Sequence, residues 1–222
     1  MPLRACTGKV RGVYRNLPTP GGIGYTLPVV IYLDHNATAP LHPRALEAMG
    51  PFLGVRGNAS SLHTLGREAK AAVESARVSV ARLMGAANPA SVVFTSGGSE
   101  SDVWALQGAF SGPLGARNEL VVSTVEHPAV LETAKALERR GVELRYAPVD
   151  EHSRLLALEL SPRTRLVSVM RANNETGSLY DIAAVVAAAK GVGAAVHCDA
   201  VQAAGRVPVE VDVWGLDFCA IS

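Results

Sequence analysis

The sequence is poor in cysteine and has no long apolar run. Its three cysteines, Cys6, Cys198 and Cys219, are too few and too widely spaced for a disulfide framework or a zinc-ligand motif. The longest apolar stretches, such as residues 182–189 and 193–196, are far shorter than the roughly 20 residues that a membrane-spanning helix needs. These absences predict a protein of a reducing compartment without a membrane span. We expect it in the cytoplasm rather than in a mitochondrion.

Neither sign of charge dominates the sequence. The 21 Lys and Arg residues nearly balance the 20 Asp and Glu residues, which leaves a formal net charge of +1. Proteins that bind nucleic acid or anionic membranes carry strongly basic surfaces, so we expect neither partner. Hydrophobic residues make up 48% of the 222 residues, which is enough to bury the core of a large domain.

Residues 1–29 differ in composition from the rest of the chain. They contain several basic residues and no acid, a bias found in organelle transit peptides. However, they also lack serine, and the prolines and glycines between residues 18 and 24 interrupt any amphipathic helix. We therefore expect a disordered or mis-annotated leader rather than a targeting signal.

From residue 30 onward, short apolar runs alternate with longer segments of helical period, the pattern of an α/β domain with a mostly parallel sheet. Strands are predicted at residues 29–33, 91–94, 120–123, 143–146, 166–170, 194–198 and 216–221. Helices are predicted at residues 43–52, 65–84, 99–110, 128–140 and 181–192. Because ligands bind at the carboxyl ends of strands in such sheets, a domain that ends at residue 222 is expected to be cut inside its site.

Residues 95–101, with the sequence TSGGSES, follow a predicted strand and open a predicted helix. Glycines allow a tight turn, and a helix N-terminus attracts anions, so Gly98 and the Ser99 hydroxyl are candidates to bind a phosphate. An ordinary loop with Ser99 as the helix cap remains an alternative. A remote alternative is a serine hydrolase using Ser99, although Ser101 replaces the second glycine of a nucleophile elbow.

A predicted strand also ends in an acid, Asp199. A buried carboxylate is costly unless it is paired, and a protonated pyridine nitrogen is one partner that would satisfy it. Alternatively, Asp199 caps the loop that follows the strand.

Two more loops bring polar residues to the same expected edge of the sheet. Residues 126–128 contain His127, which can stack on a flat ring or exchange protons, and residues 173–177 contain Asn174, which can bond a phenolic oxygen. Each residue has a structural alternative. The convergence of several such loops at one edge favours a binding site.

The ordered set of motifs resembles the cysteine desulfurases and selenocysteine lyases of the class V aminotransferase fold, over residues 30–222. The motifs are YLDHNATAP at residues 32–40, GNASSLH at 57–63, TSGGSES at 95–101, EH at 126–127, NNETG at 173–177 and HCDAVQ at 197–202. The resemblance implies the large domain of a fold type I enzyme that depends on pyridoxal 5'-phosphate.

The resemblance also implies roles for individual residues. The phosphate is expected to contact Gly98, Ser99 and Ser222, and the ring nitrogen to pair with Asp199. His127 is expected to stack on the ring and to be catalytic, and Asn174 and Gln202 to contact the phenolic oxygen.

The implied reaction converts L-cysteine to L-alanine with transfer of sulfur, or acts on selenocysteine in the same way. A homodimer, a sulfur or selenium acceptor protein and a link to iron–sulfur cluster assembly are the partners that the resemblance implies.

In the family, the next residues are Gly-His-Lys, whose lysine holds the cofactor, followed later by a nucleophilic cysteine and a small C-terminal domain. None of these is present. The four lysines of the chain, Lys9, Lys70, Lys135 and Lys190, lie in the leader or in predicted helices. We therefore expect a large domain truncated at its C-terminus and inactive alone, or, alternatively, a non-catalytic short isoform with a binding role.

Overall fold

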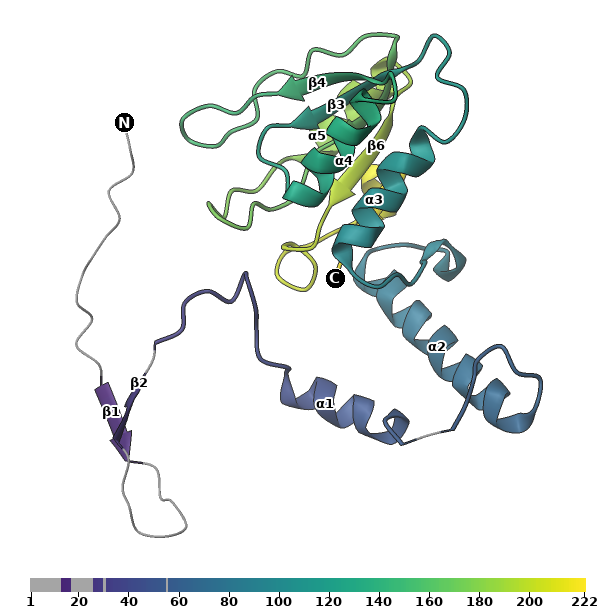
Figure 1. Ribbon diagram of the computed structural model, residues 1–222, viewed down its shortest axis with the longest axis vertical. Coiled ribbons are helices and arrows are strands. Elements are labelled where there is room, and N and C mark those ends of the chain that lie inside the picture. The colour runs from purple at the N-terminus through teal and green to yellow at the C-terminus, as the bar shows by residue number, and fades with distance from the viewer. Residues whose placement is uncertain (1–12, 17–25, 30, 55) are drawn as a thin grey trace. The chain divides into compact units, whose positions relative to one another are not determined.

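A computed structural model of the protein describes residues 13–16, 26–29, 31–54 and 56–222 (Figure 1). The chain divides into two compact units, residues 1–42 and 43–222. In the first unit, β1 (Val13–Asn16) pairs with β2 (Thr26–Val29) as an antiparallel hairpin. These strands lie within the predicted leader, whose other residues are outside the described ones. Residues 31–34 form no strand, so the prediction of a strand at residues 29–33 is wrong for that part.

The second unit contains a five-stranded sheet with the order β4-β3-β5-β6-β7, in which every neighbouring pair is parallel. The strands are β3 (Glu119–Ser123), β4 (Glu143–Ala147), β5 (Thr164–Ser168), β6 (Ala195–Asp199) and β7 (Phe218–Ala220). The predicted α/β class with a parallel sheet is therefore confirmed. All five strands differ slightly from the prediction. The bounds of β3, β4 and β6 differ by one residue, β5 is shifted two residues toward the N-terminus, and β7 is shorter than predicted.

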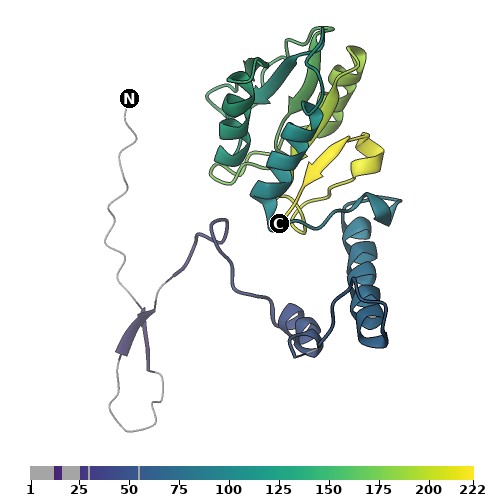
Figure 2. The same cartoon turned by 45° about the vertical axis from the view of Figure 1, so that its right-hand side comes forward.

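Helices cover both faces of this sheet (Figures 1 and 2). On one face, α3 (Gly98–Ala109) and α4 (Pro128–Glu138) bury Leu120 and Leu166 of the strands. On the other face, α5 (Ile182–Gly191) packs against Val121 and Val167. Successive strand residues point to opposite faces of the sheet. Because helices cover both faces, residues that point either way are buried, and the strands are continuous apolar runs.

The segment before α3 consists of α1 (Pro43–Met49), the short helix η1 (Gly50–Phe52) and the long helix α2 (Thr64–Leu83). The end of α2 is attached to the sheet unit, because Met84 is buried in the core cluster that contains α5. A short helix that the sequence did not reveal, α6 (Val211–Trp214), holds this junction. The Val211 amide donates to the Met84 carbonyl at 2.9 Å, and the Ala87 amide donates to Asp212 Oδ2 at 2.7 Å.

The strand predicted at residues 91–94 is wrong. Residues 89–91 form the short helix η2 (Pro89–Ser91), and residues 92–95 carry no strand ladder. The residues have strand-like composition, but a strand exists only where a neighbouring chain segment pairs with it.

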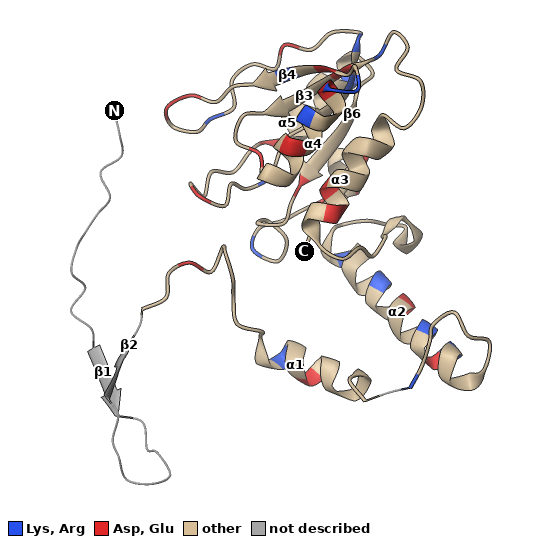
Figure 3. Ribbon diagram, viewed as in Figure 1, with Lys and Arg blue, Asp and Glu red and all other residues tan. Residues whose placement is uncertain are grey.

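The charge of the described residues is mixed, with acidic and basic side chains interspersed along α2 and around the sheet (Figure 3). Within the described parts of the chain, no helix is both long and apolar enough to span a membrane.

Candidate active site

The candidate site lies at the carboxyl ends of the parallel strands, where the loops after β3, β5, β6 and β7 emerge beside the start of α3. Gly98 demonstrates how closely these elements approach. A β-carbon on Gly98 would lie 2.7 Å from Val201 Cγ2 and 3.4 Å from Ser222 Cβ. The first residue of α3, the loop after β6 and the segment after β7 therefore meet at one point, and a larger residue at position 98 would require the Val201 side chain to move.

The start of α3 is an open helix N-terminus. Its N-cap is Gly97, which has no side chain to bond the first amides, and Ser99 lies exposed in the first turn. The alternative in which Ser99 caps the helix is therefore wrong. Unsatisfied amides at a helix N-terminus bind anions. The one acid of this turn, Glu100, accepts a hydrogen bond from the Ser96 amide, which lowers the pKa of its carboxyl.

Asp199 is the last residue of β6 and is 5% exposed. Burial, followed by the negative charge of Asp102, raises the pKa of its carboxyl. The Val201 amide, which donates to Oδ1 at 2.9 Å, and the two histidines His197 and His127 act in the opposite direction. The predicted loop contact is therefore present, and it uses one of the roughly four acceptor positions of the carboxylate.

His127 lies at the start of α4, where its Nδ1 accepts a hydrogen bond from the Ala129 amide at 3.1 Å. This contact confirms the structural alternative for His127. It also fixes the imidazole orientation, and the side chain remains exposed. A capping role and a role in stacking on a ring are compatible, because capping uses one ring atom and stacking uses the ring face.

Glu126, next to His127, is a buried acid that the sequence did not single out. Its Oε1 accepts from the Ser123 hydroxyl and from the Met170 amide at 2.7 Å, whereas its buried Oε2 has no hydrogen-bond partner among the described residues. Burial raises the pKa of Glu126 to about 8. At neutral pH this carboxyl is therefore protonated, and it ties the loop after β3 to the end of β5.

A second link joins the same two loops. Asn173 accepts from the amides of Glu175 and Thr176 at 2.9 and 2.8 Å, and its Nδ2 donates to the Val125 carbonyl at 3.1 Å. These bonds shape the loop that presents the half-buried Asn174. Asn173 was also missed as an individual residue. The sequence alone does not show which of the two adjacent asparagines, Asn173 or Asn174, is buried.

Gln202 follows Asp199 at the same edge, but its Oε1 accepts a hydrogen bond from the Arg206 guanidinium at 2.6 Å. The side chain is thus engaged in its own loop. Its amide nitrogen is the part that a ligand oxygen would use.

Cys198 is a poor nucleophile. Cys198 is buried, and its contact with Cys219, followed by burial, raises the pKa of its thiol well above the usual value. A thiol with a raised pKa carries little thiolate, the reactive form. Both cysteines are partly or fully buried, as predicted.

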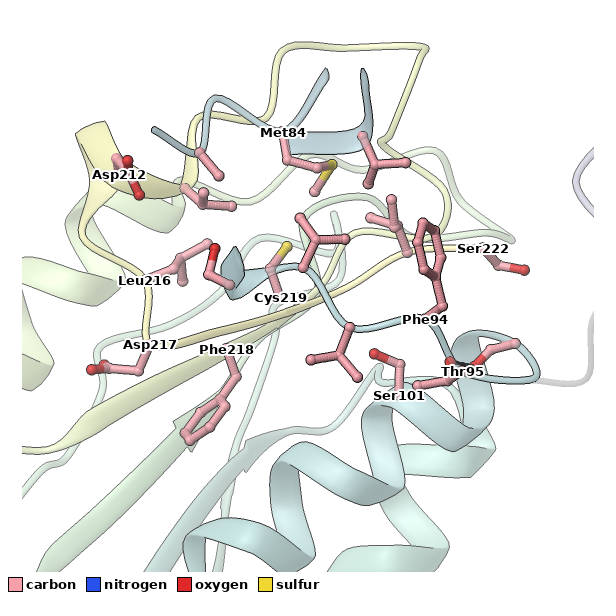
Figure 4. A pocket seen from close by; sticks show the side chains of 18 of the residues that line it. Met84, Phe94, Thr95, Ser101, Asp212, Leu216, Asp217, Phe218, Cys219 and Ser222 are labelled. Carbon is pink, nitrogen blue, oxygen red and sulfur yellow. Dashed lines mark hydrogen bonds between the residues drawn. The ribbon is translucent and has the colours of Figure 1, made fainter. Parts of the chain in front are cut away.

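Cys219 lines a hollow of about 530 Å³ along the free edge of β7 (Figure 4). Met84 and Phe94 also line this hollow, and Ser222 lies at its rim. The unpaired segment 92–95 forms part of the opposite wall. Ser222 is the one candidate site residue among the residues that line this hollow.

None of the lysines in the described residues reaches the carboxyl edge. Lys70, Lys135 and Lys190 are exposed on α2, α4 and α5. Ser99, in turn, has no hydrogen bond to a histidine or a carboxylate among the described residues, so the geometry supplies no base for a serine nucleophile.

The comparison with known proteins agrees with the observed fold. The chain belongs to the aminotransferase class-V family, whose profile matches residues 31–222. It is 42% identical over 198 residues to a cysteine desulfurase of Gluconacetobacter diazotrophicus, an alignment that covers 86% of this chain and 49% of that protein.

Two solved structures have the same architecture. A NifS-like protein superposes with a TM-score of 0.80 at 34% identity, covering 86% of this chain and 54% of the other. The structure of SspA in complex with cysteine gives a TM-score of 0.81 at 30% identity, covering 86% and 56%. The expected family and fold type are confirmed, and the chain spans about half the length of the curated relatives it matches.

Proposed function

We propose that the chain is the cofactor-binding part of a pyridoxal 5'-phosphate enzyme that removes sulfur from L-cysteine, or selenium from selenocysteine, to leave L-alanine. The observation that carries this proposal is Asp199. This buried carboxylate lies at the end of β6. The open N-terminus of α3 is beside it, and Gly98 there is in close contact with Val201. An anion site and an acid that needs a cationic partner lie together at the carboxyl edge of the sheet.

The residues present fit this cofactor. The first-turn amides of α3 and the hydroxyls of Ser99 and Ser222 would hold the phosphate. Asp199 would accept a hydrogen bond from the protonated ring nitrogen. This positive charge would pair with the carboxylate and offset the cost of burying it. His127 would lie over the ring, and Asn174 with the amide of Gln202 would bond the phenolic oxygen.

The cofactor, when bound, supplies an electron sink for bond cleavage at the substrate amino acid. The chain's own contribution is binding and orientation. Asp199 keeps a proton on the ring nitrogen, and the neutral Glu126 holds the loops of His127 and Asn173 together without adding a negative charge. Cysteine as the substrate is supported by the names of the relatives and by the SspA structure in complex with cysteine. A sulfur acceptor protein and a homodimer belong to the same proposal.

The cofactor part is tested with pyridoxamine 5'-phosphate, because this ligand has the ring and the phosphate but needs no lysine. We expect the purified 222-residue chain to bind it, and Asp199→Ala to weaken binding at least about tenfold, the scale of a hydrogen bond to a charged group. Glu132→Gln, on the exposed face of α4, is the control and should bind as the unchanged chain does. Equal binding by the Asp199→Ala variant would contradict the assignment.

The chemical part needs a separate measurement. An antibody raised against residues 64–84 would isolate the protein from its source cells, and alanine formation from L-cysteine and L-selenocysteine would be measured in the isolate. Alanine formation with both or either substrate supports the proposal, whereas a cofactor-containing isolate that forms none refutes it. The purified 222-residue chain itself is expected to give no turnover and no site-specific adduct with pyridoxal phosphate after borohydride reduction, since its described lysines lie on distant helical surfaces.

A further inference from the structure

A buried pair of ionisable groups lies behind the candidate site. Asp102 on α3 and His197 on β6 are 1% and 0% exposed, and Asp102 Oδ1 lies 3.3 Å from His197 Nε2. Neither atom has a hydrogen-bond partner among the described residues, so each is the nearest chemical complement of the other. On the opposite side of the ring, His197 Nδ1 lies 2.8 Å from the hydroxyl of Ser168, the residue directly across from it on β5.

The pair connects the two halves of the proposed site. Asp102 belongs to the helix that begins at Gly98, one turn after the amides that would hold the phosphate. His197 stands two residues before Asp199 on the same strand, so both side chains point to the same face of the sheet. Val196 and Cys198, which alternate with them, pack on the opposite face with α5. The contact between Asp102 and His197 therefore sets how the helix of the phosphate site lies against the strand of the ring-nitrogen site.

Such a contact matters because the phosphate and the ring nitrogen of pyridoxal phosphate are held at a fixed separation by covalent bonds. The groups that bind the phosphate and the ring nitrogen must have the same separation. A small misplacement of either group weakens binding. Two unpaired buried polar groups are also costly, so their placement opposite each other is better explained by a specific role than by packing.

We propose that Asp102 is a positioning residue that acts through His197 to hold Asp199 at the correct distance from the phosphate-binding start of α3. This inference rests on the proposed function. Asp102 is buried and contacts His197, so its influence on Asp199 passes through β6. Its negative charge lies close enough to oppose ionisation of Asp199, and the adjacent His197 offsets that effect.

The test is a double-mutant cycle read out as affinity for pyridoxamine 5'-phosphate. Asp102→Ala is expected to weaken binding by about tenfold, and His197→Gln by a similar factor. Asp102→Asn keeps an oxygen that can accept from His197 Nε2 and should restore binding to within about threefold of the unchanged chain. In the Asp199→Ala background, Asp102→Ala should change affinity by less than about twofold, because the group on which it acts is gone.

A matched control separates positioning from simple support of the core. Leu106→Ala removes a fully buried side chain one turn further along the same helix, in the cluster shared with α4. It should lower the thermal midpoint at least as much as Asp102→Ala while leaving the affinity nearly unchanged, provided that affinity is measured well below the midpoint. If Leu106→Ala weakens binding as strongly as Asp102→Ala, the effect is general and the proposal is overturned.

The outcomes also separate this inference from the proposed function. Binding by the unchanged chain that is lost in Asp199→Ala but unaffected by Asp102→Ala would overturn the positioning role alone. An Asp102→Ala penalty of equal size with and without Asp199 would do the same. Failure of the unchanged, folded chain to bind pyridoxamine phosphate would overturn the proposed function, and the positioning role with it. If Asp102→Ala does not fold, His197→Gln and Asp102→Asn carry the same comparison.

Discussion

The sheet region, residues 98–222, and the segment before it, residues 43–97, bury their apolar side chains to very different extents. In the sheet region, Leu120 and Leu166 are fully buried between the strands and α3 and α4. In the earlier segment, Leu53 and Leu62 are 71% and 89% exposed, and the buried hydrophobic residues among those that the structure describes are Ala81 and Met84. The sheet region thus supplies its own core, whereas the earlier segment carries apolar surface that its own residues do not cover.

The two regions differ in whether their own residues cover their apolar side chains. Each strand of the sheet pairs with a neighbour and packs under a helix of the same region, so its buried core comes from residues 98–222 except for Met84. Large exposed apolar surfaces mark contacts with another chain or chain segment. The homodimer in the proposed function is one arrangement that would cover the leucines of residues 43–65.

The largest expected effect is on the core of the sheet region. Leu166→Ala should lower the free energy of unfolding by about 2–5 kcal/mol, because it removes a buried side chain and leaves a cavity. Leu62→Ala should change it by less than about 0.5 kcal/mol. Urea unfolding followed by circular dichroism measures both, and equal losses would remove the distinction between the two regions.

The next effect concerns the buried acid Glu126 and depends on pH. Burial raises its pKa to about 8 in the folded protein, from an ordinary value of 4.5. Below pH 4.5 both folded and unfolded states carry the proton. Between pH 4.5 and about 8 only the folded state retains it, so the contribution of Glu126 to stability is lost progressively over that range and stays lost at higher pH.

Glu126→Gln, which mimics the protonated acid, should therefore gain stability relative to the unchanged protein as the pH rises from 5 to 8. The gain should be at least about 1.4 kcal/mol, which corresponds to one pKa unit. Unfolding midpoints at several pH values measure it. A constant difference between the two proteins across this range would show that Glu126 is ionised in the folded state.

A smaller effect is expected where the two regions join. Asp212→Ala removes the hydrogen bond to the Ala87 amide and should cost about 1 kcal/mol. Hydrogen exchange of the amides near residue 87 should accelerate, while β3 and β5 should exchange as before. Glu74→Ala, which removes the partner of Arg77 on the exposed side of α2, serves as the control and should leave the junction unchanged. Equal acceleration in both variants would show that Asp212 does not hold the junction.

The smallest effect on folding is expected from polar substitution in the exposed segment. Leu62→Ser should leave the unfolding midpoint unchanged within error but reduce the fluorescence of a dye that binds apolar surface, and reduce self-association in sedimentation. An unchanged dye signal and unchanged sedimentation would mean that the exposed leucines of residues 43–65 are not an interaction surface.

Much of the architecture followed from the sequence because alternation of apolar runs and helical periods is a local property. The helices at residues 64–83, 98–109 and 128–138 lie within a few residues of their predicted positions. The strand predicted at residues 91–94 was wrong because strand formation is not a local property. Its residues favour an extended conformation, but strand formation depends on a neighbour that the local sequence does not specify.

The candidate site divides in the same way. Position at the carboxyl end of a strand, which is readable from the sequence, identified Asp199 and the loops of His127 and Asn174. The roles of Asp102, Glu126 and Asn173 were missed, since each depends on a partner from a distant element. For Asp102, the sequence offered one indication of burial. This charged residue lies one helical turn before an apolar residue of the same helix, Leu106.

The sequence by itself determined the α/β class, the order of the motif loops and the family, because these follow from local periodicity and from residue types at fixed spacing. Tertiary packing alone places Ser99 inside the first helical turn, Gly98 close to Val201 and Asp102 opposite His197. The physical reason is that these properties depend on distances between elements far apart in the chain, which are fixed only when the helices pack on the sheet.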